Sequence, residues 1–273
     1  MNSTNNDDAL LRIRDLSVRI GGKQVLKQVS MDLPAGQVTG LAGESGSGKS
    51  MTALAVLGLL PQAATATGAV ELDGRDLLTL PGRQLARVRG RRVAMVFQDP
   101  AAAFHPLLSI GSQLTDHVRH HLGLARKEAR ARASELLRQV RLPDADGALG
   151  KYPHEFSGGQ LQRIAIASAI ACQPAVLLAD EPTTALDVTV QAGILRLLRS
   201  LSDELGLATL LITHDLGVMS AVADTVTVLR SGQVVESGPR FDVLTRPKHA
   251  YTRALIEALP QNSLPGQLGD RDE

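Results

Sequence analysis

The sequence is poor in aromatic residues, cysteine and long apolar runs, and each shortage excludes a class of protein. Aromatic residues make up 2% of the 273 positions and Trp is absent, so the core must be built from Leu, Val, Ile and Ala. The single cysteine, Cys172, cannot form an internal disulfide or a paired-cysteine metal site, which favours a reducing compartment. No apolar run approaches the ~20 residues that span a bilayer. The polar, acidic start also lacks the features of a signal peptide. Any membrane role must therefore come through a partner.

The charge is almost balanced, with a formal net charge of +1 and 21% charged residues. Proteins that bind nucleic acid usually carry a strongly basic face, so nucleic acid is not expected as the main partner. Hydrophobic residues make up 44% of the chain, which is enough for a large core. The composition is that of a globular protein.

Hydrophobic periodicity predicts an α/β fold. The first strands alternate apolar and polar residues, as half-buried antiparallel strands do, whereas later strands are continuous apolar runs, typical of a covered parallel sheet. The predicted strands are 11–20, 25–33, 37–41, 69–72, 92–97, 175–179, 208–213, 225–229 and 233–236. The predicted helices are 49–60, 126–140, 161–171, 188–205, 241–245 and 249–259.

One stretch breaks this alternation. From 99 to about 160 strand signals vanish, and 126–140 carries apolar residues at helical spacing. We therefore expect one domain over 10–260, with a helical subdomain inserted at about 99–160. Residues 1–9 and 261–273 are expected to be disordered tails.

A glycine-rich motif after the predicted strand 37–41 fits GxxxxGK[ST] and opens a predicted helix. In that context it predicts a phosphate-binding P-loop, because glycines let backbone N–H groups surround phosphate oxygens at a helix start. Lys49 would reach the β- and γ-phosphates, and the Ser50 hydroxyl would bind Mg²⁺. The simpler alternative is a glycine-rich turn. The predicted nucleotide-binding residues are Gly43, Glu44, Ser45, Gly46, Ser47, Gly48, Lys49, Ser50 and Met51.

A second motif is the apolar strand that ends in Asp180 and Glu181. A buried strand places Asp180 at the carboxyl edge of the sheet, where ligands bind in open α/β sheets. Asp180 would hold Mg²⁺, and Glu181 would orient or deprotonate the attacking water. The alternative is a strand-end cap followed by a turn at Pro182. Together with the P-loop, the motif predicts a metal-binding and catalytic role for these two acids.

A third motif, Ser157-Gly158-Gly159-Gln160, stands before a predicted helix. Ser157 is a good N-cap, and the glycines leave N–H groups open at the helix start, which makes a second anion-binding site. One nucleotide seldom needs two such sites so far apart in the sequence. The spacing suggests that this one serves a nucleotide held by another copy of the fold.

With these motifs the chain resembles the ABC transporter ATPase family, whose LSGGQ signature corresponds to Phe156–Gln160 here. The resemblance covers nearly the whole chain and implies a head-to-tail dimer, with ATP between the P-loop of one subunit and the signature of the other. It also implies roles for three further residues. Gln98 matches the Q-loop that touches Mg²⁺, Asp187 matches the D-loop at the dimer interface, and His214 matches the switch histidine that contacts the γ-phosphate.

One position departs from the family pattern. Most members carry an aromatic residue that stacks on adenine in the first hairpin, and Ile20 stands there in this chain. The resemblance therefore implies looser binding of the base, with less strict selectivity for adenine.

Three segments resemble the oligopeptide, dipeptide and nickel importer group: 96–111, 152–156 and 249–260. This resemblance implies a second ATPase subunit, which is the same chain or a paralogue, two permease subunits and an extracytoplasmic binding protein. The chain would sit peripherally on the cytoplasmic face of the membrane and power uptake of peptides or of nickel and other metal chelates. Longer members hold an iron–sulfur cluster in a cysteine-bearing tail, and without those cysteines no cluster is predicted.

Other functions stay open as alternatives. They are an ABC exporter ATPase, a soluble ABC ATPase that acts on DNA or ribosomes, and an ATP-binding scaffold without catalysis. The soluble class usually has two ATPase units, a long coiled coil or zinc modules, and the scaffold would lack Glu181 or His214. A metal site at His117, His120 and His121 is a further possibility from their helical spacing. A solvated helix face is the simpler explanation of these histidines.

Overall fold

The strands form two sheets in a computed structural model that describes residues 9–184 and 186–258. The antiparallel sheet has the order β2-β1-β4-β5, from β1 (Ala9–Ile20), β2 (Lys23–Pro34), β4 (Ala64–Leu72) and β5 (Arg75–Asp76). The core sheet has the order β10-β9-β3-β8-β7-β6 and is parallel except for the β9–β10 pair. Its strands are β3 (Val38–Ala42), β6 (Val93–Val96), β7 (Val176–Asp180), β8 (Ala208–Ile212), β9 (Thr225–Arg230) and β10 (Gln233–Pro239). The predicted α/β class is confirmed, with its antiparallel N-terminal sheet and mostly parallel core.

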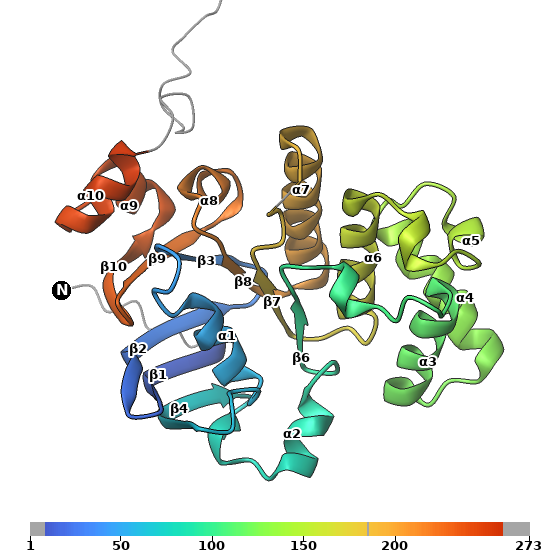
Figure 1. The fold of residues 1–273 in the computed structure, drawn as a ribbon, viewed down its shortest axis with the longest axis horizontal. Coiled ribbons are helices and arrows are strands. Elements are labelled where there is room, and N and C mark those ends of the chain that lie inside the picture. Colours follow the sequence, from blue (N-terminus) through green and yellow to red (C-terminus); the bar gives the residue numbers. More distant parts are fainter. Residues whose placement is uncertain (1–8, 185, 259–273) are drawn as a thin grey trace, which may run out of the picture.

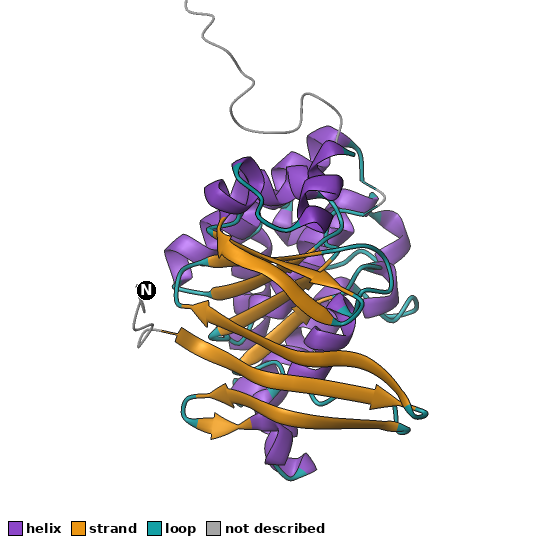
Figure 2. Ribbon diagram, turned by 90° about the vertical axis from the view of Figure 1, so that its left-hand side faces the viewer, coloured by secondary structure: helices purple, strands orange, loops and turns teal. Residues whose placement is uncertain are grey.

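The helices between residues 110 and 170 gather at one end of the molecule, and the remaining helices lie along the core sheet and beside the antiparallel sheet (Figure 1). The antiparallel sheet lies at the other end, and Figure 2 shows its long strands below those of the core sheet. The α-helices are α1 (Lys49–Val56), α2 (Gly82–Val88), α3 (Ile110–Leu122), α4 (Arg126–Gln139), α5 (Ala145–Ala148), α6 (Gly158–Ile170), α7 (Val188–Leu205), α8 (Leu216–Val222), α9 (Arg240–Thr245) and α10 (Ala250–Glu257). Short 3₁₀ turns are η1 (Leu77–Thr79), η2 (Ala101–Ala103) and η3 (Pro153–Glu155).

The core has two hydrophobic layers because the core sheet is covered on both faces. Along β7, Leu177 and Ala179 pack into the layer shared with the helices. Val176 and Leu178 pack into the layer shared with α1 and the antiparallel sheet. Side chains of a strand alternate between its two faces, so a continuous apolar run is what such a strand requires.

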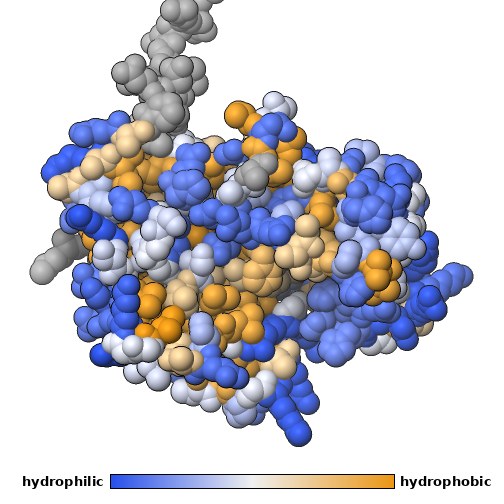
Figure 3. Space-filling view, in the orientation of Figure 1, coloured by the Kyte–Doolittle hydropathy of each residue, from blue (hydrophilic) through white to orange (hydrophobic). Residues whose placement is uncertain are grey.

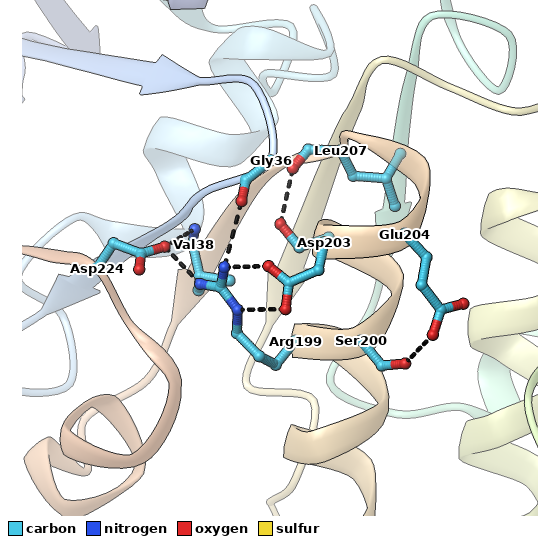
Figure 4. Close-up of polar contacts among 9 residues, drawn as sticks. Gly36, Val38, Arg199, Ser200, Asp203, Glu204, Leu207 and Asp224 are labelled. Atoms are coloured by element: carbon cyan, nitrogen blue, oxygen red, sulfur yellow. Dashed lines mark hydrogen bonds and ion pairs between the residues drawn. The ribbon is translucent and has the colours of Figure 1, made fainter.

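One ionic network ties α7 to the start of the core sheet (Figure 4). The Arg199 guanidinium forms ion pairs with Asp203 on the same helix and with Asp224 at the start of β9. Asp224 also accepts a hydrogen bond from the Val38 N–H at 2.8 Å, where β3 begins. Hydrogen bonds from Arg199 to Asp203 raise the pKa of the guanidinium and keep it charged. The network fixes the end of the sheet opposite to the motif-bearing loops.

The inserted stretch 99–160 is helical, with α3, α4, α5, η2 and η3 and, in this described stretch, no strand. The apolar residues of α4 that were predicted to face the core are buried, including Ala129, Leu136 and Leu137.

Several predicted boundaries are wrong. Helix α1 ends at Val56 rather than near Leu60, because Gly58 takes a left-handed φ of +60° and turns the chain away. Strand β4 begins at Ala64, well before 69, because its backbone pairs with β1 along the whole length. Ala9, predicted to be in the N-terminal tail, begins β1. The rest of that tail and the predicted tail 261–273 lie outside the described residues. The short helices α2 and α8 were not predicted.

Candidate nucleotide-binding and hydrolysis site

The P-loop connects β3 to α1 and wraps around the Lys49 side chain. Lys49 is 5% exposed, and its Nζ donates hydrogen bonds to the carbonyl oxygens of Gly43 at 2.7 Å and Glu44 at 2.9 Å. Gly48 precedes α1 with φ +109°, and a Cβ there would lie 2.5 Å from Leu26 Cδ2. Burial lowers the pKa of Lys49, although the nearby carboxylates oppose this shift. The loop therefore holds a buried ammonium group where the motif predicts phosphate.

A cavity of about 310 Å³ opens beside this loop. It brings together most of the predicted P-loop residues, the Q-loop residue and the hydrolytic carboxylate. Its lining residues are Val25, Ser45, Gly46, Gly48, Lys49, Ser50, Met51, Gln98 and Glu181.

Asp180 ends β7 next to this cavity, as its motif predicts. Asp180 pairs in register with Ile212 of β8, and Leu41 of β3 pairs with the same residue, so the three strands end at one edge of the sheet. Burial raises the pKa of Asp180, although a hydrogen bond from Ser50 opposes this. Asp180 Oδ1 is buried and has no hydrogen-bond partner among the described residues. An unsatisfied buried carboxylate oxygen beside a hydroxyl group fits the oxygen ligands that Mg²⁺ takes.

Glu181 follows in a left-handed conformation, with φ +46°. Residues other than glycine seldom adopt this region, and strain of this kind concentrates at functional sites. Its Oε2 accepts a hydrogen bond from the Thr184 hydroxyl at 2.9 Å, and its Oε1 lies 3.2 Å from His214 Nδ1. Burial raises the pKa of Glu181, but the hydrogen bonds from His214 and Thr184 outweigh it, so the net shift is downward. Glu181 is therefore an ionised carboxylate aimed at the cavity.

The signature segment lies elsewhere on the chain. Ser157 caps α6 as predicted: its hydroxyl accepts from the Gln160 N–H at 3.3 Å, and Gln160 Oε1 accepts from the Ser157 N–H at 3.0 Å. Gly158 and Gly159 form the first turn of α6. A Cβ at Gly159 would lie 2.4 Å from Val190 Cγ1, so this glycine is required where α6 passes α7. None of these residues lines the phosphate cavity.

Asp187 is also apart from the cavity. It caps α7, and its Oδ1 accepts from the Val190 N–H at 2.9 Å. The structure therefore groups the P-loop, Gln98, Asp180, Glu181 and His214, and leaves the signature and Asp187 outside this group.

The base side of the site has few groups that could hold adenine. The cavity lining includes the apolar Val25 and Met51 and, among described residues, no aromatic side chain. Ile20, at the position where the family carries an aromatic residue, is partly buried against the antiparallel sheet. The contacts that the site offers are therefore concentrated on the phosphates.

A second, apolar pocket of about 300 Å³ was not predicted from the sequence. It lies between β6, the end of α1 and the helices α3 and α6, and it is lined by Leu57, Leu59, Met95, Phe97, Phe104, His117 and Ala165, among others. Leu59 and Phe97 are 43% and 44% exposed, so two large apolar side chains face solvent at this pocket. Figure 3 shows further hydrophobic residues over α1 and the neighbouring strands, whereas the helical end is mostly hydrophilic.

The expected solvated face for the three histidines is wrong for His117. Its ring lines the apolar pocket, its Nε2 lies 3.8 Å from Cys172 Sγ, and its centroid is 4.7 Å from that of His121. Burial, with the neighbouring His121 and His120, lowers the pKa of His117 to about 4. Among the described residues no group of His, Cys, Asp and Glu has the geometry of a metal site.

Two family models match the sequence. One, described as ABC transporter, matches residues 26–184. The other, described as the C-terminal region of oligopeptide/dipeptide transporters, matches residues 235–271. Among the described helices, none combines the length and the apolar character needed to cross a membrane.

Curated relatives match along almost the whole chain. A "Probable peptide ABC transporter ATP-binding protein" of Sinorhizobium fredii is 46% identical over 95% of this chain and 79% of its own length. A "Probable D,D-dipeptide transport ATP-binding protein" of Escherichia coli is 45% identical over 91% of this chain and 76% of its own. A "Glutathione import ATP-binding protein" of Shigella dysenteriae is 44% identical over 86% of this chain and 39% of its own.

Solved structures agree with the fold. A bacterial ABC transporter cassette in dimeric form superposes with a TM-score of 0.74 at 28% identity, covering 84% of this chain and 98% of the cassette. A dimeric post-hydrolysis state of an ATP-binding cassette, bound to ADP and Pi, gives a TM-score of 0.73 at 28% identity, with the same coverage of both chains.

Proposed function

Because the chain belongs to the oligopeptide and dipeptide import family of ABC transporter ATP-binding proteins, we propose that it hydrolyses ATP at the P-loop cavity to power the uptake of peptides or peptide-like compounds. The observation that carries this is that Lys49 and Glu181 line one cavity, while His214 contacts Glu181 and Asp180 contacts the cavity residue Ser50. Asp180 and Glu181 stand at the end of β7, His214 follows β8 and Lys49 begins α1, which is the edge where α/β sheets bind ligands.

The chain's own residues have separable roles in hydrolysis. The Lys49 ammonium, now bound to two loop carbonyls, would exchange them for β- and γ-phosphate oxygens. Glu181, ionised and directed by Thr184 and His214, would orient the attacking water and accept its proton. The His214 ring is 59% exposed, so its other face can meet the γ-phosphate. Together they would stabilise in-line attack.

Ser50, Asp180 and Gln98 would hold Mg²⁺. The partnerless Oδ1 of Asp180 and its contact with Ser50 support this assignment. When bound, the ion would neutralise charge on the phosphate oxygens.

We further propose that the working unit is a head-to-tail dimer. The signature residues Ser157–Gln160 form an intact capping box but do not line the phosphate cavity of their own chain. Their N–H groups would therefore meet the ATP of a partner, with Asp187 at the same interface. The dimeric state of the similar bacterial cassette supports this arrangement.

The inserted helical stretch 99–160 would serve as the docking subdomain for the permeases. The apolar pocket between it and β6 would receive a short cytoplasmic helix of a permease subunit, with exposed Phe97 and Leu59 as contacts. The neighbour of Phe97, Gln98, lines the nucleotide cavity instead. Two consecutive residues thus connect the two pockets, which supports coupling of ATP occupancy to permease motion.

The remaining partners and location follow from that assembly. The chain would work with two permease subunits at the cytoplasmic face of the membrane and depend on an extracytoplasmic binding protein. The relatives' names mention peptides, D,D-dipeptides and glutathione, and these support a peptidic cargo. Uptake of nickel or metal chelates stays a prediction.

The purified chain with Glu181→Gln tests the assignment. It should bind ATP with the affinity of the parent and accumulate as an ATP-bound dimer, while hydrolysis falls by at least about 100-fold, the usual scale for loss of a general base. ATP affinity is measured by titration, dimer formation by size-exclusion chromatography with light scattering, and hydrolysis by phosphate release. Glu204→Gln, an exposed carboxylate on α7, is the matched control. Normal turnover of Glu181→Gln would contradict the proposed role.

A further inference from the structure

The C-terminal helix contacts the P-loop through a single tyrosine. The Tyr251 hydroxyl, on α10, accepts a hydrogen bond from the Glu44 N–H at 3.2 Å, across 207 positions of sequence. Tyr251 is 7% exposed and belongs to the main hydrophobic core, although Glu44 itself is at the surface. This phenol is therefore held in place and directed at the start of the phosphate-binding loop.

The position of Tyr251 is built by its neighbours. His249 caps α10 and accepts from the Tyr251 N–H at 3.1 Å. Glu236 of β10 accepts from the N–H groups of Lys248 at 2.8 Å and His249 at 3.0 Å, which fixes the helix start to the sheet. The Arg230 guanidinium, at the end of β9, lies 4.7 Å from the centre of the Tyr251 ring, a cation–π geometry.

Tyr251 and Lys49 hold opposite sides of one peptide group. The peptide between Gly43 and Glu44 donates its N–H to Tyr251 and accepts Lys49 Nζ on its carbonyl oxygen at 2.7 Å. A peptide group is planar, so fixing the N–H direction also fixes the carbonyl direction. Gly43, at φ +149°, has no side chain to resist rotation, and any Cβ would lie 2.2 Å from Leu229 O. The orientation must therefore come from outside the loop.

From these contacts we propose that Tyr251 is a positioning residue for ATP binding: its hydroxyl orients the Gly43–Glu44 peptide, and thereby the Lys49 ammonium, for the phosphates. The proposal deepens the proposed function and rests on it. It gives the region matched by the oligopeptide/dipeptide C-terminal model a physical role, which is to support the phosphate cradle from behind. The β9–β10 hairpin gives the same kind of support further along the loop, because the Gly232 N–H donates to Ser47 O at 2.9 Å.

Tyr251→Phe in the full chain tests this, because it keeps the ring and its contact with Arg230 and removes only the hydroxyl. One uncharged hydrogen bond corresponds to about a three- to tenfold change in affinity. The dissociation constant and KM for ATP should rise by that factor. Because Tyr251 touches no reacting atom, kcat should stay within about twofold. Tyr152→Phe, at the other tyrosine, is the matched control and should bind ATP as the parent does.

A spectroscopic readout separates positioning from mere packing. The chain has two tyrosines and no Trp, so in Tyr152→Phe the fluorescence comes from Tyr251 alone. A non-hydrolysable ATP analogue should change this emission, and Lys49→Ala should abolish the change.

Three results would overturn the inference. The first is unchanged ATP affinity in Tyr251→Phe, and the second is a fall in both kcat and melting temperature with KM unaltered. The third is tyrosine emission that does not respond to the nucleotide. If the parent chain itself binds no ATP, the proposed function fails rather than this inference.

Discussion

At the scale of single residues, Glu181 combines strain with hydrogen bonding. Its left-handed backbone turns the side chain from the end of β7 toward the cavity, and Thr184 and His214 hold both carboxylate oxygens. Glu181 and His214 were identified by their motifs in the sequence, but neither contact was predicted. The structure adds that they act on one carboxylate.

Thr184→Val should shift the pH dependence of hydrolysis. Losing the hydroxyl removes one bond that stabilises the charged form, so the pKa of Glu181 rises and the ionised base is lost at higher pH. The acid limb of the kcat profile should move to higher pH, with kcat at neutral pH little changed. Thr65→Val, at an exposed position of β4, is the control. A profile identical to that of the parent would show that Thr184 does not influence the base.

His117 should make the fold sensitive to acid. Its pKa is about 4 in the folded chain and near 6.5 when unfolded, so between these values the unfolded chain binds more protons. The stabilisation is therefore complete above pH 6.5 and is lost as the pH falls toward 4.

His117→Gln cannot titrate and should lose less stability over this range, by about 1–2 kcal/mol after allowing for partial exposure. Urea unfolding at pH 7 and pH 4.5 measures it, with exposed His120→Gln as the control. Equal pH dependence in His117→Gln and the parent would refute the assignment.

At the scale of helices and strands, long periodic segments were predictable, whereas the short helices were predicted unevenly. Helix α7 was predicted with the bounds that it has, because its apolar stripe and its Asp187 cap both mark it. Helices α2 and α8, with seven residues each, were missed, although α9, with six, was predicted near its bounds. The apolar run after Val56 was predicted to be helical, but part of it lines the second pocket. The sequence alone does not distinguish apolar residues of the core from apolar residues that line a surface pocket.

Arg199 links α7 to β3 and β9, and Arg199→Met should weaken this connection. The substitution keeps the apolar stem and removes the ion pairs with Asp203 and Asp224. Because these groups are partly exposed, we expect the free energy of unfolding to fall by about 1–2 kcal/mol. Chemical denaturation measures it, and Arg196→Met, exposed on the same helix, should change it little. A loss no greater than that of Arg196→Met would mean the network is not stabilising.

At the scale of the whole molecule, the head-to-tail dimer that we propose would give the chain half of each of two ATP sites. The phosphate cavity and its carboxylates were predictable because their motifs have fixed local spacing. The apolar pocket, the burial of His117 and the support from Tyr251 were not, because they join residues that only the tertiary fold brings together. The signature residues were predictable as a motif, and their absence from the lining of the cavity agrees with the prediction that they serve the nucleotide of another copy.

Mixing two inactive variants should restore hydrolysis if sites are shared between subunits. Lys49→Ala disables a P-loop and Ser157→Arg disables a signature, so a mixed dimer keeps one site with both parts intact. Each variant alone should be inactive, and an equimolar mixture should regain about a quarter of parental turnover by random pairing in a symmetric dimer. Phosphate release measures it, with Ala131→Arg, exposed in the helical insertion, as the control. Full activity of Ser157→Arg alone would show a site complete within one chain.

Because Phe97 and Gln98 line different pockets, the two positions differ in which substitutions they can accept. Phe97 lines one pocket and Gln98 the other, immediately after β6. Substituting Phe97 would change the shape of the pocket that we propose for the permease helix without altering the nucleotide cavity. Inserting or deleting one amino acid here would instead change which side chain reaches each pocket, because consecutive residues line the two pockets. At this junction the identity of Phe97 is therefore free to vary, whereas Gln98 is constrained by its proposed role at Mg²⁺ and the length of the segment is fixed.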